Sequence, residues 1–200
     1  MIQLLAHEWT YRSLRIVGFG LFVGYLLYAG DYSFSIVWVA IYVIVSVLIA
    51  WSMVRLHLSE RFPALNRYYF RPLQQDGQRE VLSENAWTKA YAQYLASGMR
   101  GYTMLFAPAE DGLICVPILV AGINPLSAIL GGIAFGLLHV GRFTYLECIG
   151  KSIIYSVVCF YILPHGLLTV VGGHFMLNLL AFAGVTAALR SRALNEPPEP

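Results

Sequence analysis

Residues 128–143 read AILGGIAFGLLHVGRF, an apolar and glycine-rich run that contains a single histidine, His139. The run lies within a longer stretch, Gly112–Gly141, that holds no charged side chain. One spanning helix needs roughly 20 apolar residues, and this stretch is longer than that. Because it also contains the turn-forming pair Asn124-Pro125, it predicts two membrane helices joined by a short turn.

The composition of the whole chain favours the same class. Of its 200 residues 58% are hydrophobic and 12% are charged, whereas roughly 25% are charged in soluble domains. Its three cysteines lie in apolar segments, and their number and spacing predict neither a disulfide framework nor a metal site. The sequence therefore predicts an all-α, polytopic membrane protein.

We expect about six transmembrane helices in one integral membrane domain, residues 1–200. Their expected positions are Leu14–Gly30, Phe34–Val54, Tyr102–Ile123, Leu126–Val140, Thr144–Leu163 and Leu167–Leu189. The first is expected to be a retained helix rather than a signal peptide, because no small-residue cleavage site follows an apolar core.

The expected domain has three parts. Residues 1–100 hold two helices and a polar segment, 55–100, which predicts a cytoplasmic amphipathic helix on the membrane surface. A small soluble loop helix is the alternative there. Residues 102–189 form a four-helix core and residues 190–200 form a tail, of which we expect the proline-rich, acidic part Asn195–Pro200 to be disordered.

The basic residues predict the orientation. With six helices and both termini inside, all of the 13 basic residues except Lys151 fall on the cytoplasmic side. Cytoplasmic loops carry an excess of Lys and Arg in membrane proteins. We therefore expect a multi-pass protein of the cell (inner) membrane with cytoplasmic termini, in contact with the lipid bilayer and with no nucleic-acid partner.

Two adjacent carboxyl groups, Glu110 and Asp111, lie in an apolar segment. An ionisable side chain at the middle of the membrane raises the free energy of insertion by at least about 2.5–3.5 kcal/mol. Neither Glu110 nor Asp111 has a Lys or Arg three or four residues away on its helix. Burial of this kind suits a general base or acid. The alternative is that the helix begins later and leaves both groups hydrated, which Pro108 favours.

Two histidines lie in the other apolar segments. His139 follows Phe135 by four residues and Asn178 follows His174 by four, so each pair shares one face of its helix. Together with the carboxyl groups they predict a polar site built from three helices. Polar side chains also join membrane helices to one another, and that structural role is the alternative.

In this order, the motifs resemble those of the CAAX-protease and bacteriocin-processing (CPBP, Abi-type) glutamic intramembrane proteases. The family pattern is Glu-Glu-x-x-x-Arg, then Phe-x-x-x-His, then His-x-x-x-Asn or Asp. This chain has Glu110-Asp111, then Phe135 with His139, then His174 with Asn178. It departs at Asp111, which shortens the second acid, and at Cys115, which stands at the arginine position.

The resemblance implies roles for these residues. Glu110 would activate a water molecule that His139 helps to hold, and His174 and Asn178 would stabilise the oxyanion. Asp111 and Phe135 would support them. The implied reaction is metal-free hydrolysis of a membrane-tethered or lipidated peptide, with no cofactor.

Three alternatives stay open. Cys115 favours a catalytically inactive relative that acts as a membrane binding or scaffold protein. Two histidines and a glutamate are also a possible zinc-peptidase ligand set, although no His-Glu-x-x-His run occurs. The least favoured alternative is a small proton-coupled transporter that uses Glu110 as a relay.

The predicted topology contains one conflict. It places His139 near the cytoplasmic end of its helix, whereas His174 lies roughly 24 Å from the level of Arg190 at 1.5 Å per residue. The site requires both histidines at one depth.

Overall fold

The computed structural model describes residues 8–58, 106–139 and 145–195, and apart from short connections these residues are helical, as predicted. The α-helices there are α2 (Glu8–Ala29), α3 (Ile36–Leu58), α5 (Phe106–Ala121), α6 (Pro125–Leu138), α7 (Tyr145–Val157) and α8 (Leu167–Asn195). A π-helical turn, Val158–Ile162, and a 3-10 turn, Leu163–His165, extend α7. The predicted amphipathic helix lies outside the described residues, because only 55–58 of its segment are placed, and they belong to α3.

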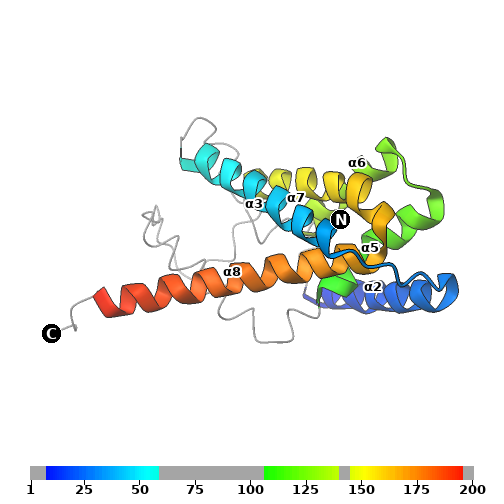
Figure 1. Ribbon diagram of the computed structural model, residues 1–200, viewed down its shortest axis with the longest axis horizontal. Coiled ribbons are helices and arrows are strands. Elements are labelled where there is room, and N and C mark those ends of the chain that lie inside the picture. Colours follow the sequence, from blue (N-terminus) through cyan, green and yellow to red (C-terminus); the bar gives the residue numbers. More distant parts are fainter. Residues whose placement is uncertain (1–7, 59–105, 140–144, 196–200) are drawn as a thin grey trace.

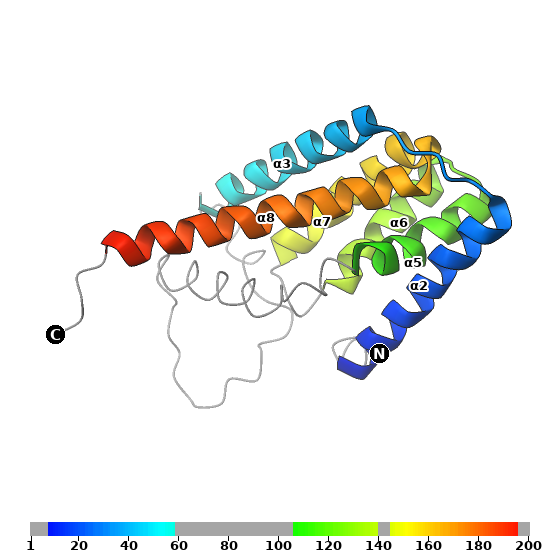
Figure 2. The same cartoon turned by 60° about the horizontal axis from the view of Figure 1, so that its bottom comes forward.

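The helices form a bundle in which α2 lies along α5, α6 along α7 and α3 along α8 (Figure 1). The C-terminal part of α8 extends beyond the other helices, as the turned view also shows (Figure 2). With 29 residues, α8 is about 44 Å long at 1.5 Å per residue. It is therefore longer than the roughly 30 Å hydrocarbon core of a bilayer.

Glycines bring two of these helix pairs into close contact. A Cβ atom at Gly18 of α2 would lie 1.9 Å from the Ala109 carbonyl oxygen, and one at Gly112 of α5 would lie 2.1 Å from the Gly18 carbonyl oxygen. Between α6 and α7, a Cβ atom at Gly136 would lie 1.9 Å from Ser152 Oγ. Small residues let membrane helices approach closely. Here they draw α2 and α7 against the helices that carry the predicted site.

The turn before α6 is confirmed. Asn124 caps the helix, since its side chain accepts a hydrogen bond from Ser127 N and its own N–H donates to Ser127 Oγ. Pro125 occupies the first turn, where a missing N–H removes no helical hydrogen bond. The resulting helix has 14 residues, or about 21 Å, which is shorter than a bilayer core.

Two described segments, Ile36–Met53 and Tyr145–His165, are long and apolar enough to cross a membrane by length and composition. Shorter apolar segments lie in α2, α6 and α8. Large apolar side chains of α3 also point away from the bundle, among them Val37, Ile44 and Leu48. The all-α class is confirmed and these features are compatible with a membrane protein, but the helix lengths do not show six full spans.

Three helices extend further than the sequence predicts. α2 begins at Glu8 rather than Leu14, α3 ends at Leu58 rather than Val54, and α8 ends at Asn195 rather than Leu189. Residues 190–195 include Arg, Ala and Leu, which favour helix, and the first proline of the tail comes only at Pro197. The segment expected to be disordered begins at Asn195, which the structure places as the last residue of α8, and residues 196–200 lie outside the described residues.

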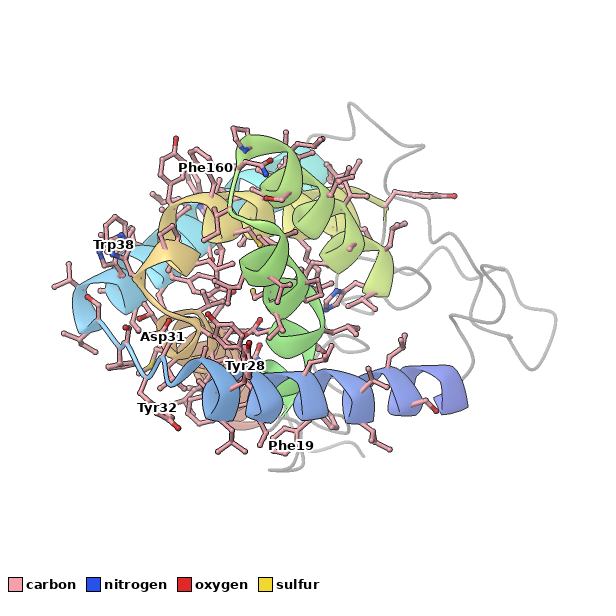
Figure 3. All side chains as sticks on the ribbon, turned by 90° about the vertical axis from the view of Figure 1, so that its right-hand side faces the viewer. Phe19, Tyr28, Asp31, Tyr32, Trp38 and Phe160 are labelled. Atoms are coloured by element: carbon pink, nitrogen blue, oxygen red, sulfur yellow. The ribbon has the colours of Figure 1, made fainter. Side chains whose placement is uncertain are left out.

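One end of the bundle is rich in aromatic residues. Tyr28, Tyr32 and Trp38 lie around the connection between α2 and α3, and Trp38 stacks on His165 with ring centroids 4.0 Å apart (Figure 3). Within this connection, the hydrogen bonds from Ser33 lower the pKa of Asp31 below its ordinary value. Tyr and Trp are enriched where membrane helices meet water, which agrees with a bundle end at a membrane surface.

Candidate active site

The two predicted carboxyl groups lie in the second turn of α5. Glu110 is 8% exposed and Asp111 is 0% exposed, so the hydrated helix start that Pro108 favoured is wrong. Pro108 instead lies in the first turn of α5, where proline is tolerated. Both groups are therefore buried at a helix position that faces the interior of the bundle.

Glu110 lies between two basic groups from other helices. Arg15 Nη2 of α2 donates a hydrogen bond to Glu110 Oε1 at 3.2 Å, and the Arg15 guanidinium lies 3.3 Å over the Phe106 ring. On the other side, His174 Nε2 of α8 lies 4.0 Å from Glu110 Oε2. The sequence reasoning missed Arg15 because it sought a partner only within the same helix.

Asp111 binds a different set of groups. His174 Nδ1 lies 2.9 Å from Asp111 Oδ1, and the Tyr155 hydroxyl of α7 donates a hydrogen bond to the same oxygen. Asp111 Oδ2 is buried and accepts no hydrogen bond from the described residues. Nothing in the sequence pattern distinguished Tyr155, which lies within an ordinary apolar helix.

Cys115, at the family's arginine position, lies beside Tyr155. Its Sγ atom is 3.3 Å from the Tyr155 hydroxyl oxygen, one helical turn beyond Asp111. The second carboxylate therefore has a donor, which comes from α7 instead of from the next turn of α5. A phenol donor carries no charge, unlike the arginine that the resemblance implies.

Phe135 of α6 joins the aromatic groups of the site. Its ring stacks on Tyr155, with centroids 3.9 Å apart, and lies 5.7 Å from the His174 ring and 4.7 Å from the His139 ring. Both histidines thus contact one side chain, and the conflict in their predicted depth disappears. The C-terminal part of α8 extends beyond the other helices, so a depth counted back from the end of α8 does not give the level of His174 in the bundle.

His139 is fixed at the C-terminal end of α6. Its backbone N–H donates to Gly136 O at 3.1 Å, and its ring Nδ1 lies 2.8 Å from Phe135 O. Because a carbonyl oxygen only accepts hydrogen bonds, Nδ1 carries a proton. In the neutral ring Nε2 is then an acceptor, which is the state that can hold a water O–H.

Asn178 lies on α8 one turn after His174 and is half-buried. It makes no hydrogen bond with the carboxyl groups or the histidines in the described part of the chain. The structure thus gathers Glu110, Asp111, Phe135, His139 and His174, adds Arg15 and Tyr155, and leaves Asn178 at the margin.

A small pocket opens beside Glu110. It is lined by Leu14, Arg15, Ala109, Glu110, Leu113 and Leu138, and has a volume of about 10 Å³, which is roughly the space that one water molecule requires. Leu138 directly precedes His139. The pocket therefore lies against Glu110 and Arg15, and its lining reaches the residue next to His139 but does not include the His139 ring.

Among the described residues, no cluster of three or more His, Cys, Asp or Glu side chains has the geometry to hold a metal ion. The zinc-peptidase alternative therefore gains no support from these residues.

Comparisons with known proteins identify no relative. No family model matches the chain, and neither a curated protein nor a solved structure matches it. The motif resemblance to CPBP proteases consequently stays a prediction from the sequence.

Proposed function

We propose that this chain is an intramembrane peptidase of the glutamic, CPBP-like type. The observation that carries the proposal is the position of Glu110, buried between Arg15 and His174 beside a pocket the size of one water molecule. A carboxylate in a water-poor site, with a positioned water, is the arrangement that general-base hydrolysis requires.

In the proposed reaction Glu110 takes a proton from the water held by His139. The water oxygen bonds to the scissile carbonyl carbon, and the carbonyl oxygen becomes an oxyanion. Glu110 then passes its proton to the amine nitrogen as the C–N bond breaks, so the products are a carboxylic acid and an amine. Arg15 donates to Glu110 Oε1, and Oε2, which lies 4.0 Å from His174 Nε2, is the proposed proton acceptor.

His174 is the proposed oxyanion donor. Because Asp111 accepts from Nδ1, His174 can also donate from Nε2 when it is an imidazolium, and the two carboxylates would stabilise that charge. Preorganised donors at a developing oxyanion contribute about 3–4 kcal/mol each in well-studied hydrolases. The side-chain amide of Asn178 is the proposed second donor to the oxyanion, once it turns toward the substrate.

The proposed setting is the cell (inner) membrane, with several spans and cytoplasmic termini. The basic residues of the sequence favour this orientation. Arg15 near the start of α2, Glu110 near the start of α5 and His139 at the end of α6 then lie toward the cytoplasmic side. A peptide held there by a lipid or a membrane anchor is the proposed substrate class.

The test is hydrolysis by the purified full-length chain in phosphatidylcholine and phosphatidylglycerol vesicles. The probe is a randomised library of acyl-anchored peptides in heavy-oxygen water, read by mass spectrometry. We expect wild type to release fragments with one heavy oxygen in the new carboxyl group. Glu110→Gln, His139→Ala and His174→Ala should release none, whereas Asp31→Asn and His165→Ala, matched changes outside the site, should behave as wild type. Cleavage by Glu110→Gln would refute the mechanism.

A binding or scaffold protein is the second candidate. The ion pair between Arg15 and Glu110 favours it, because a carboxylate whose charge is compensated by a guanidinium is a weaker base. This candidate predicts that wild type, like Glu110→Gln, leaves every library peptide intact. Retention of intact peptide on wild-type vesicles, lost in His174→Ala, would then support a binding role.

A further inference from the structure

Tyr155 makes three contacts inside the candidate site, and the proposed reaction assigns it no role. Its hydroxyl donates to Asp111 Oδ1 and lies 3.3 Å from Cys115 Sγ, while its ring stacks on Phe135 at an interplanar angle of 5°. The side chain is 0% exposed. The stacked ring and the buried carboxylate together direct the Tyr155 O–H bond toward Asp111.

Asp111 is the reason that this direction matters. It too is 0% exposed, and a buried carboxylate stays ionised only where donors compensate its charge. Two donors reach Oδ1, one from Tyr155 and one from His174, whereas Oδ2 receives none from the described residues. Of these two donors, only the Tyr155 hydroxyl donates whatever the protonation state of His174.

We infer that Tyr155 is a positioning residue that acts on His174 through Asp111. The Tyr155 hydroxyl keeps Asp111 ionised, and the ionised Asp111 holds His174 as an imidazolium with Nε2 directed toward Glu110. Tyr155 thereby supplies from α7 the donor that Cys115 does not supply from α5. The inference rests on the proposed function for its catalytic consequence, but the state of His174 is measurable without any substrate.

These contacts also predict how loss of the Tyr155 hydroxyl changes the protonation of Asp111 and His174. Without it, the ionised form of Asp111 loses one of its two donors at a site from which water is excluded. The proton shared with His174 then moves to Asp111, and His174 becomes a neutral ring. A neutral ring is a weaker oxyanion donor than an imidazolium, because charge-assisted hydrogen bonds are roughly twice as strong as neutral ones.

The test is nitrogen NMR of the full-length chain in vesicles, with labelled histidine. Wild type is compared with Tyr155→Phe and with Tyr161→Phe, an exposed tyrosine of the neighbouring turn; His174→Gln assigns the signals. We expect both ring nitrogens of His174 to be protonated in wild type and in Tyr161→Phe, and one to lose its proton in Tyr155→Phe. A neutral His174 in wild type, or an unchanged His174 in Tyr155→Phe, would overturn the inference.

The kinetic arm uses the library peptide that wild type cleaves fastest. We expect Tyr155→Phe to lower kcat about 10-fold with KM unchanged, as for an interaction made in the transition state only. A role confined to packing would lower the amount of folded protein without this separation of kcat from KM. If Glu110→Gln is inactive but Tyr155→Phe has the wild-type kcat and NMR signals, the inference fails while the proposed function stands. Activity in Glu110→Gln would instead refute the proposed function.

Discussion

His174 lies between the adjacent carboxyl groups of α5, with Nδ1 2.9 Å from Asp111 Oδ1 and Nε2 4.0 Å from Glu110 Oε2. The two acids therefore differ in role although they are neighbours in the chain. Asp111 lies within hydrogen-bond distance of His174 and does not line the pocket. Glu110 lines the pocket and lies further from the His174 ring. In the proposed reaction, this asymmetry favours an orienting role for Asp111 and the proton-transfer role for Glu110.

Asp111→Asn separates the charge of this residue from its shape. An amide oxygen still accepts hydrogen bonds from Tyr155 and from His174 Nδ1, so we expect the folded protein to accumulate. The missing charge no longer stabilises an imidazolium, and kcat should fall at least about 10-fold. Peptide cleavage and the yield of monodisperse protein in detergent measure the two effects.

Asp111→Ala is the matched comparison. It removes the acceptor and leaves the Tyr155 hydroxyl buried without that partner, which should reduce the free energy of unfolding by about 1–3 kcal/mol. If Asp111→Asn lost as much stability as Asp111→Ala, shape rather than charge would explain the role of the residue, and the assignment would be wrong.

The ion pair between Arg15 and Glu110 can be measured by a double-mutant cycle. Both side chains are largely buried, at 19% and 10% exposed, so removal of Arg15 alone leaves a charge without this compensating partner. We expect Arg15→Ala to lower thermal stability more in wild type than in Glu110→Gln, with a coupling free energy of about 1–3 kcal/mol. Thermal unfolding in detergent for the four proteins gives this value.

The double-mutant cycle also tests whether Arg15 of α2 contacts Glu110 in the folded protein. Additive effects of the two substitutions would show that Arg15 and Glu110 do not interact in solution. Arg12, whose side chain lies outside the described part of the structure, is unsuitable as a control, and Asp31→Asn serves instead because Asp31 lies in the α2–α3 connection.

Phe135→Leu tests the aromatic ring that both histidines contact. Leucine retains most of the buried volume, so we expect a loss of stability of only about 1–1.5 kcal/mol. The ring contacts with His139, His174 and Tyr155 are lost, and activity should fall more than stability. Phe135→Ala, by contrast, should cost about 3–5 kcal/mol and impair folding. Unchanged activity in Phe135→Leu would reduce Phe135 to a volume-filling residue.

Sequence reasoning predicted the helices well because each lies in an apolar run with a clear boundary. Asn124-Pro125 and the Pro164-containing turn carry local signals, and the structure places helix ends at both. It also selected Glu110, Asp111, His139 and His174 as one group, since their spacing along three helices matched a known pattern. In the structure, His139 and His174 contact Phe135, and His174 lies close to both Asp111 and Glu110.

The partners of these residues were beyond the reach of the sequence. Arg15 and Tyr155 contact the carboxyl groups from helices that are 95 and 44 residues away along the chain. No helical period relates such positions, because the contacts depend on how α2 and α7 pack against α5. Arg15 had one usable signal, its place at the basic end of the first helix, but the topology argument had already assigned it to orientation.

The contact between α2 and α5 gives a test that depends on one methyl group. At Gly18 an added Cβ atom would lie 1.9 Å from the Ala109 carbonyl oxygen, whereas at Gly20, on the same helix, it would meet nothing within 4 Å. Gly20→Ala should therefore stabilise the protein by about 0.5–1 kcal/mol through helix propensity alone. Gly18→Ala has the same propensity gain but must move α2 away from α5, which should cost about 1–3 kcal/mol and draw Arg15 away from Glu110. Thermal unfolding of both variants in detergent measures the difference, and an equal or greater stability of Gly18→Ala would contradict the close packing that places Arg15 in the site.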